Sequence, residues 1–175
     1  MADLMQGTIE IVKGRYPKRI WERMNSLIGG HFEEFENVYQ FEDAEAINGE
    51  FSDLEEFLIE QGIPFDRKSV GFCEIQPEHR IFRPGIIDRV LIQNNAGETY
   101  ITTDFLRLVL QQQIPAEEMV ILIQAMVDKA DPTYPDLMNY RFLWVSNESN
   151  EPFFPEESKE EDGNIRVLAV IGDVT

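Results

Sequence analysis

The chain has little of what most enzymatic and metal chemistry requires: one cysteine, two histidines and 15 basic residues among 175. A single cysteine excludes an internal disulfide framework and a cysteine-rich zinc site. No apolar run approaches the roughly 20 residues that cross a bilayer. The first 14 residues include Asp3 and Glu10 and lack the basic start and apolar core of a signal peptide. These absences predict a cytoplasmic protein that does not contact a membrane.

Basic residues are outnumbered by 33 acidic ones, which gives a net charge of −18 and a pI near 4.4. Direct binding to nucleic acid is therefore not expected, since affinity for phosphate chains comes mostly from Lys and Arg. The apolar content of 43% is that of a globular protein. The length suits one domain, 1–175, in which the acidic, Pro-containing stretch 147–163 is expected to be a loop. The sequence leaves the oligomeric state open.

The acidic residues are concentrated in one stretch. From His31 to Glu60 there is no Lys or Arg, whereas five basic residues lie between Lys13 and Arg23. Whether this basic segment neutralises the acidic stretch is open at the level of sequence. Such a concentrated field costs stability unless a basic surface faces it. We therefore predict that the acidic stretch binds a partner, through Glu33, Glu34, Glu36, Glu42, Asp43, Glu45, Glu50, Asp53, Glu55, Glu56 and Glu60.

Hydrophobic periodicity and turn residues predict an α+β fold, with a mainly antiparallel sheet built from hairpins and about four helices packed on it. The expected strands are 8–12, 38–41, 140–145 and 164–171, with hairpins over 72–83 and 89–102. The expected helices are 17–28, 52–61, 103–113 and 115–130.

The helix over 52–61 places part of the acidic stretch. Ser52 followed by Glu55 has the spacing of a capping box. Leu54, Phe57 and Leu58 form an apolar stripe at helical spacing, which we expect to be buried. With that phase, the acidic side chains of the helix, Glu55 included, point to solvent.

Candidate chemistry is sparse. Cys73 and His79 could approach one another on the proposed hairpin, but a nucleophilic site also needs an oriented base and an anion hole, and neither is evident. His31 precedes two glutamates without a metal-binding spacing such as HExxH. No calcium loop and no phosphate-binding glycine motif is present. We expect no catalytic residue, no cofactor and no metal site.

Three short blocks, Gly49 to Phe57, Gly62 to Arg67 and Arg83-Pro84-Gly85, resemble a pattern in an uncharacterised family of small acidic proteins encoded on plasmids and phages. The resemblance covers less than a quarter of the chain and transfers no catalytic residue. It implies a genetic context in which proteins often inhibit host defence or regulate the element. Acidic inhibitors that imitate DNA are one recurrent solution in that context.

These observations predict a non-enzymatic acidic protein that occupies the basic surface of a nucleic-acid-handling protein, for example as a DNA-mimic inhibitor of the antirestriction or anti-CRISPR type. Two alternatives stay open. One is a regulatory or adaptor module that binds a protein through an apolar patch while the acids confer solubility. The other is a small enzyme whose site is assembled from residues distant in sequence, which a deep pocket around Cys73, His79 or several acids would favour.

Overall fold

The computed structural model describes residues 3–146, 153–154 and 166–172, so most of the predicted loop at 147–163 lies outside the described residues. Its main feature is a six-stranded sheet in the order β3-β4-β1-β5-β6-β7, in which every neighbouring pair is antiparallel. The α+β class and the mainly antiparallel sheet are thus confirmed. The strands are β1 (Leu4–Val12), β3 (Glu33–Glu34), β4 (Val38–Ile47), β5 (Phe65–Ser69), β6 (Glu78–Arg83) and β7 (Ile87–Ile92).

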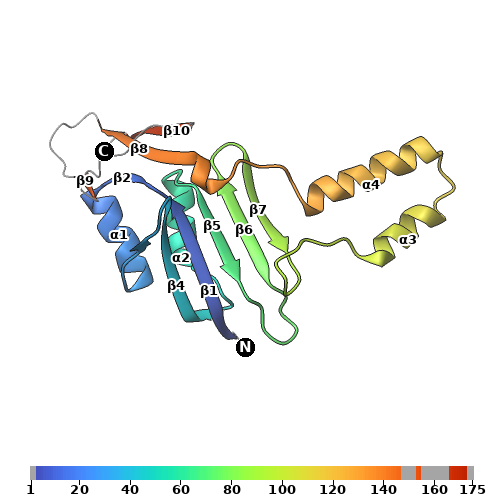
Figure 1. Ribbon diagram of the computed structural model, residues 1–175, viewed down its shortest axis with the longest axis horizontal. Helices are drawn as coiled ribbons and strands as arrows, with labels where there is room; N and C mark the ends of the chain where they lie inside the picture. The colour runs from blue at the N-terminus through green and yellow to red at the C-terminus, as the bar shows by residue number, and fades with distance from the viewer. Residues whose placement is uncertain (1–2, 147–152, 155–165, 173–175) are drawn as a thin grey trace.

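A second sheet has the order β10-β8-β2-β9 and lies at one end of the first (Figure 1). Strand β8 pairs in parallel with β10 and with β2. The contact between β2 and β8 is close, because a Cβ built on Gly14 would lie 2.1 Å from the carbonyl oxygen of Phe142. The strands are β2 (Gly14–Pro17), β8 (Tyr140–Ser146), β9 (Phe153–Phe154) and β10 (Arg166–Gly172).

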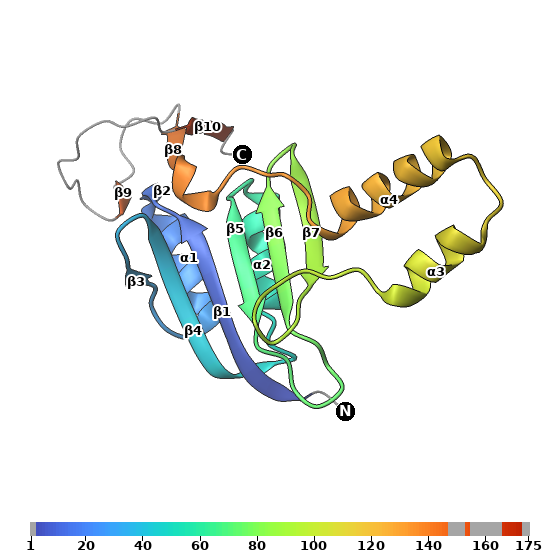
Figure 2. The same cartoon turned by 45° about the vertical axis from the view of Figure 1, so that its right-hand side comes forward.

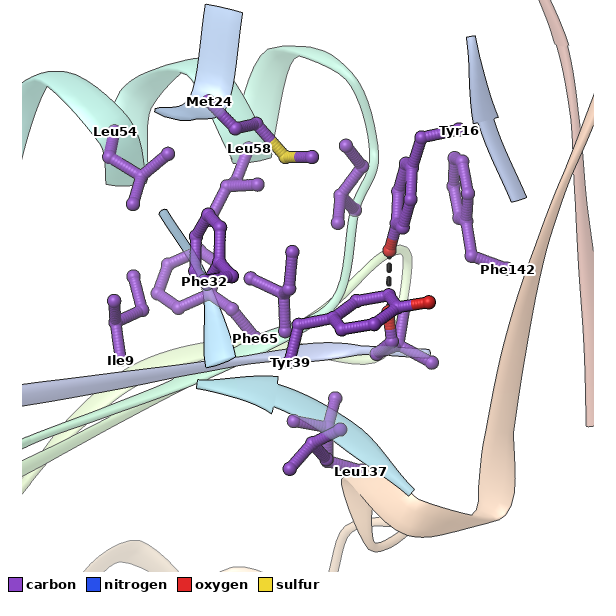
Figure 3. Close-up of a cluster of buried hydrophobic side chains, with 14 of the residues drawn as sticks. Ile9, Tyr16, Met24, Phe32, Tyr39, Leu54, Leu58, Phe65, Leu137 and Phe142 are labelled. Atoms are coloured by element: carbon purple, nitrogen blue, oxygen red, sulfur yellow. Dashed lines mark hydrogen bonds between the residues drawn. The ribbon is translucent and has the colours of Figure 1, made fainter. Parts of the chain in front are cut away.

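Helices α1 (Lys18–Ile28) and α2 (Ser52–Glu60) cover one face of the main sheet (Figure 2). Their buried side chains, Met24, Leu54 and Leu58, meet Ile9 and Phe65 from the strands (Figure 3). These positions follow the alternation of strand residues and the helical spacing read from the sequence. Leu137, in the short 3₁₀ helix η1 (Leu137–Asn139), packs on the opposite face of the sheet.

Tyr16 links the two sheets. Its ring stacks on that of Phe142, with 4.9 Å between centroids, and its hydroxyl donates a 2.6 Å hydrogen bond to the carbonyl oxygen of Val12 (Figure 3). Burial, with the Tyr39 hydroxyl as a smaller contribution, raises the pKa of Tyr16 well above its ordinary value. The phenol therefore stays neutral and holds this hydrogen bond at any ordinary pH.

Helices α3 (Thr103–Gln111) and α4 (Ala116–Ala130) do not pack on the sheet. They form a helical arm that projects beyond β7 in both views (Figures 1 and 2). The four expected helices are therefore present, but only two of them cover the sheet. Val109 is the one buried residue within the arm.

The hairpin predicted over 72–83 was wrong in its pairing, and the hairpin predicted over 89–102 is reduced to its turn and one bridge. Strand β6 pairs with β5 across a loop over 70–77 and with β7 on its other side. The segment after β7 contributes only one isolated bridge, between Gln93 and Thr99. Strand β5 was missed because its centre, Asp66-Arg67-Lys68, is charged, and charged residues are uncommon in a central strand.

Candidate functional site

An acidic-rimmed groove of about 570 Å³ lies where the end of α1, strand β4 and the start of α2 meet. Its apolar floor includes Leu27, Ile28, Phe41, Phe51 and Leu54. Phe41 and Phe51 hold one another edge to face, with ring centroids 5.7 Å apart. We call this feature the acidic groove, because its rim carries Asp43, Glu45, Glu50 and Asp53.

The groove therefore brings together four of the eleven acidic residues predicted to bind a partner. None of the residues that line it is Lys, Arg or His. Glu45 donates its backbone N–H to Asp43 at 2.9 Å, and Ser52 donates its hydroxyl to Glu50 at 3.2 Å. Both contacts fix the rim locally without neutralising its charge.

Six further predicted residues are exposed but do not line the groove. On β3, Glu34 forms a 2.8 Å ion pair with Lys13. On β4, Glu42 accepts a 2.7 Å hydrogen bond from Gln6. The others are Glu33, Glu36, Glu56 and Glu60. The exposed acids are thus spread over β3, β4 and α2 rather than gathered in one row.

The prediction that Glu55 points to solvent and binds a partner is wrong, because its side chain is 2% exposed and points into the protein. It lies 3.4 Å from Arg67, which is equally buried, and 2.9 Å from Arg80. Its Oε1 also accepts the backbone N–H of Phe51 at 3.0 Å. Glu55 therefore anchors α2 to β5 and β6 and is not part of an exposed acidic surface.

The same geometry corrects the predicted helix cap. Phe51, not Ser52, occupies the N-cap position, and the Ser52 side chain makes no cap hydrogen bond. Glu55 still accepts the backbone N–H of Phe51, but it lies four residues after this N-cap, one more than in a capping box. Leu54 and Leu58 are buried as predicted, whereas Phe57 is only partly buried at the edge of the core.

The basic segment before and within α1 is partly engaged locally. Lys13 pairs with Glu34, and Lys18 pairs with Glu22 of its own helix at 3.6 Å. The rim of the acidic groove keeps its charge, because no residue of this segment lines it.

A second cavity, a charged cleft of about 510 Å³, lies on the sheet face that α1 and α2 leave uncovered. Asp66 and Lys68 of β5, His79 and Arg83 of β6, and Glu10 of β1 line one side of it. The chain from Asp131 to Met138, between α4 and η1, forms the other side.

Asp66 is the centre of this cleft. Its Oδ2 accepts a 3.0 Å hydrogen bond from Arg83, and its Oδ1 lies 3.5 Å from Nε2 of His79. Within the part of the chain that the structure describes, neither Oδ1 nor this Nε2 has another hydrogen-bond partner. Arg83 also donates to the carbonyl oxygens of Phe65, Phe82 and Pro135, so its position is fixed on several sides.

Opposing effects set the charge of Asp66. Burial on its own raises the pKa of the carboxyl, but the facing His79 and Arg83 outweigh burial and lower that pKa below its ordinary value. Asp66 is thus ionised at neutral pH and orients the imidazole of His79. An oriented imidazole can act as a general base, although the described residues of the cleft include no Ser or Cys nucleophile.

The pairing of Cys73 with His79 does not form the core of this cleft. Cys73 is exposed in the tight turn between Phe72 and Ile75 and does not line the cleft. His31 is also exposed. Within the described residues, no group of three or more His, Cys, Asp and Glu side chains is placed to hold a metal ion.

The sequence does not predict that Asp66 and His79 face one another. The two residues are 13 positions apart, and only the pairing of Lys68 with His79 across β5 and β6 places their side chains on one face. That register depends on a strand the sequence did not reveal.

No protein-family model, curated protein or solved structure matches this chain. Among the described residues, no helix is both long and apolar enough to span a membrane. The class of this protein is therefore defined by its own fold and cavities. It is an α+β protein with an acidic groove at one corner and a charged cleft on the open face of its sheet.

Proposed function

We propose that this chain is a non-enzymatic binding protein whose acidic groove engages the basic surface of a protein that handles nucleic acid. The observation that carries the proposal is the groove itself, in which four carboxylates surround an apolar floor and no basic residue lines the wall. Lys and Arg side chains fit such a site, because their stems bury against apolar surface while their charged ends reach the rim.

The rim is supported by rigid structure. The floor rings of Phe41 and Phe51 contact one another, and α2 is tied to the sheet through Glu55, Arg67 and Arg80. A site that is already ordered loses less conformational entropy on binding. The acidic groove is thus suited to receive a basic segment without rearrangement.

The class of partner follows from charge. Proteins that bind nucleic acid present basic surfaces matched to phosphate. The exposed acids of β3 and β4 extend the field of the groove, which reaches about 8 Å at physiological salt. An inhibitor that imitates DNA, of the antirestriction or anti-CRISPR type, is the specific form that the resemblance to plasmid and phage proteins implies.

The test is affinity capture from a host lysate at low salt, with elution by a salt gradient. The groove variant combines Glu45→Lys with Asp53→Lys. The matched control combines Glu56→Lys with Glu60→Lys, which changes the net charge equally but lies outside the groove. We expect wild type and the control to retain a nucleic-acid-handling protein and the groove variant to lose it. Equal losses from both variants would contradict a specific role for the groove.

The charged cleft supports a second candidate function, a small enzyme that uses His79 as a general base. The supporting observation is the ionised, partly buried Asp66 that faces Nε2 of His79. A thermal-shift screen against small metabolites tests this candidate. The enzyme candidate requires a ligand that raises the melting temperature of wild type and leaves that of His79→Gln unchanged.

A further inference from the structure

We propose that the helical arm, α3 with α4, is the surface through which two copies of this chain associate as a two-fold dimer. The arm exposes large apolar side chains to an unusual degree. Leu110 and Ile121 are each 66% exposed, and α4 has no buried residue along its 15 positions. Val120, Leu108, Val127 and Leu122 add to the exposed set. A helix that is apolar on most sides is normally covered by other protein.

The arm also has little within one chain to hold it together. Helix α3 has nine residues, and isolated helices shorter than about 12–15 residues are marginal in water. Apart from the contact between the two helices, Arg89 of β7 donates a 3.4 Å hydrogen bond to the carbonyl oxygen of Lys129 at the end of α4. Both helices would gain stability from burial against another surface.

The small net charge of the arm favours a second copy of the chain as its binding partner. From Thr103 to Ala130 there are four acidic and two basic residues, so the arm is close to neutral while the whole chain carries −18. A strongly basic partner would favour the acidic groove, and nucleic acid would be repelled by the chain as a whole. Another arm presents the same apolar, nearly neutral surface and therefore matches it.

The position of the arm suits a symmetric arrangement. It projects beyond β7, whereas β3 and β4, with many of the acidic residues, lie at the opposite edge of the sheet (Figure 1). Six strands at about 4.8 Å spacing separate these edges by roughly 24 Å. That distance is well beyond the Debye length of about 8 Å, so the acidic ends of two copies would be screened from one another.

Two arms packed across a two-fold axis would form a four-helix arrangement. In an isologous contact the same patch is used by both copies, so each exposed apolar side chain contributes twice. The acidic grooves would face outward at the two ends of the dimer. The proposal does not depend on what those grooves bind.

Sedimentation velocity over a range of protein concentrations tests the dimer. The arm variants are Ile121→Glu and Leu110→Glu. The matched control is Ile47→Glu on β4, whose side chain is 60% exposed but lies on the main sheet. We expect wild type and the control to dimerise, and each arm variant to weaken dimerisation by about 30-fold or more. Circular dichroism checks that the helices of each variant are retained.

Hydrogen–deuterium exchange gives a second readout on the unmodified chain. The amides of 103–130 should become more protected as the protein concentration rises, while those of β4 should not change. Wild type that remains monomeric up to its solubility limit would overturn the proposal. A dimer lost in the Ile47→Glu control but kept in both arm variants would overturn it as well, because it would place the interface on the sheet.

Discussion

Glu55 of α2 and Arg80 of β6 form a 2.9 Å hydrogen-bonded ion pair, although the two residues are 25 positions apart in the chain. Arg67 lies on the other side of the same carboxylate and also contacts Glu78 at 3.0 Å. Arg80 reaches on to Asp88 of β7 at 3.2 Å. This row of alternating charges is buried at Glu55 and Arg67 and connects α2 with three strands, so the helix beneath the acidic groove depends on it.

Glu55→Ala should lower the free energy of unfolding by about 3–5 kcal/mol, because it leaves the buried Arg67 without one of its two carboxylate partners. Glu56→Ala removes the same charge from an exposed position and should change stability by about 0.5 kcal/mol or less. Equilibrium denaturation in urea measures both. Similar losses in the two variants would show that the ion pair does not stabilise the fold.

Asp66 should make the stability of the protein depend on acidic pH. Its pKa is lower in the folded state than the value of about 3.9 expected for the unfolded chain. The folded state therefore binds fewer protons, and the stabilising effect is complete above the unfolded pKa and lost as pH falls through the folded pKa.

Asp66→Asn should accordingly be less stable than wild type at neutral pH, with the difference shrinking as pH falls below about 4. Asp53→Asn, a change at an exposed position with the same effect on net charge, is the matched control for charge. Urea denaturation at a series of pH values measures the profiles. A difference between Asp66→Asn and wild type that is constant across this range would contradict the assigned pKa.

Gly14→Ala should disrupt the pairing of β2 with β8 within the second sheet. The added Cβ would lie 2.1 Å from the carbonyl oxygen of Phe142, and a backbone atom cannot move aside without separating β2 from β8. We expect a loss of about 3 kcal/mol or more, at the upper end for overpacking. Gly29→Ala is the comparison. Gly29 has φ of 63° and open space around it, so only about 1 kcal/mol of backbone strain is expected. Thermal denaturation ranks the two variants.

The elements that follow simple periodicity were predictable from the sequence. Helix α2 forms where Leu54 and Leu58 repeat at helical spacing, and both are buried as expected. The α+β class follows from such elements. The position of the arm was not predictable, because the apolar spacing of α4 is the same whether the helix packs on its own sheet or projects from it.

The charged residues of the interior were the least predictable. Glu55 has the pattern of a surface residue until Arg67 and Arg80 are placed opposite it. Arg67 comes from β5, which the sequence did not predict, and Arg80 comes from β6, for which the sequence predicted another partner strand. The facing of Asp66 and His79 depends on the same pairing of β5 with β6. A charge can be assigned to the interior only when its partner is known, and here each partner is distant in the chain.

The acidic groove should act mainly on the rate of association. Electrostatic attraction between a charged site and its partner speeds encounter and weakens as salt screens it. With the captured partner immobilised, the association rate of wild type should fall as salt rises. At low salt, Glu45→Lys combined with Asp53→Lys should associate roughly tenfold or more slowly, within the range that steering supplies. The dissociation rate should change less.

Glu56→Lys combined with Glu60→Lys again serves as the control for this experiment. It changes the net charge equally, so a smaller slowing in this variant would assign the effect to the rim of the groove rather than to the overall field. If wild type and the groove variant associate at the same rate and neither depends on salt, the acids serve only as a solvated surface. Recognition would then depend on apolar contacts, and the alternative of a regulatory or adaptor module would replace this proposal.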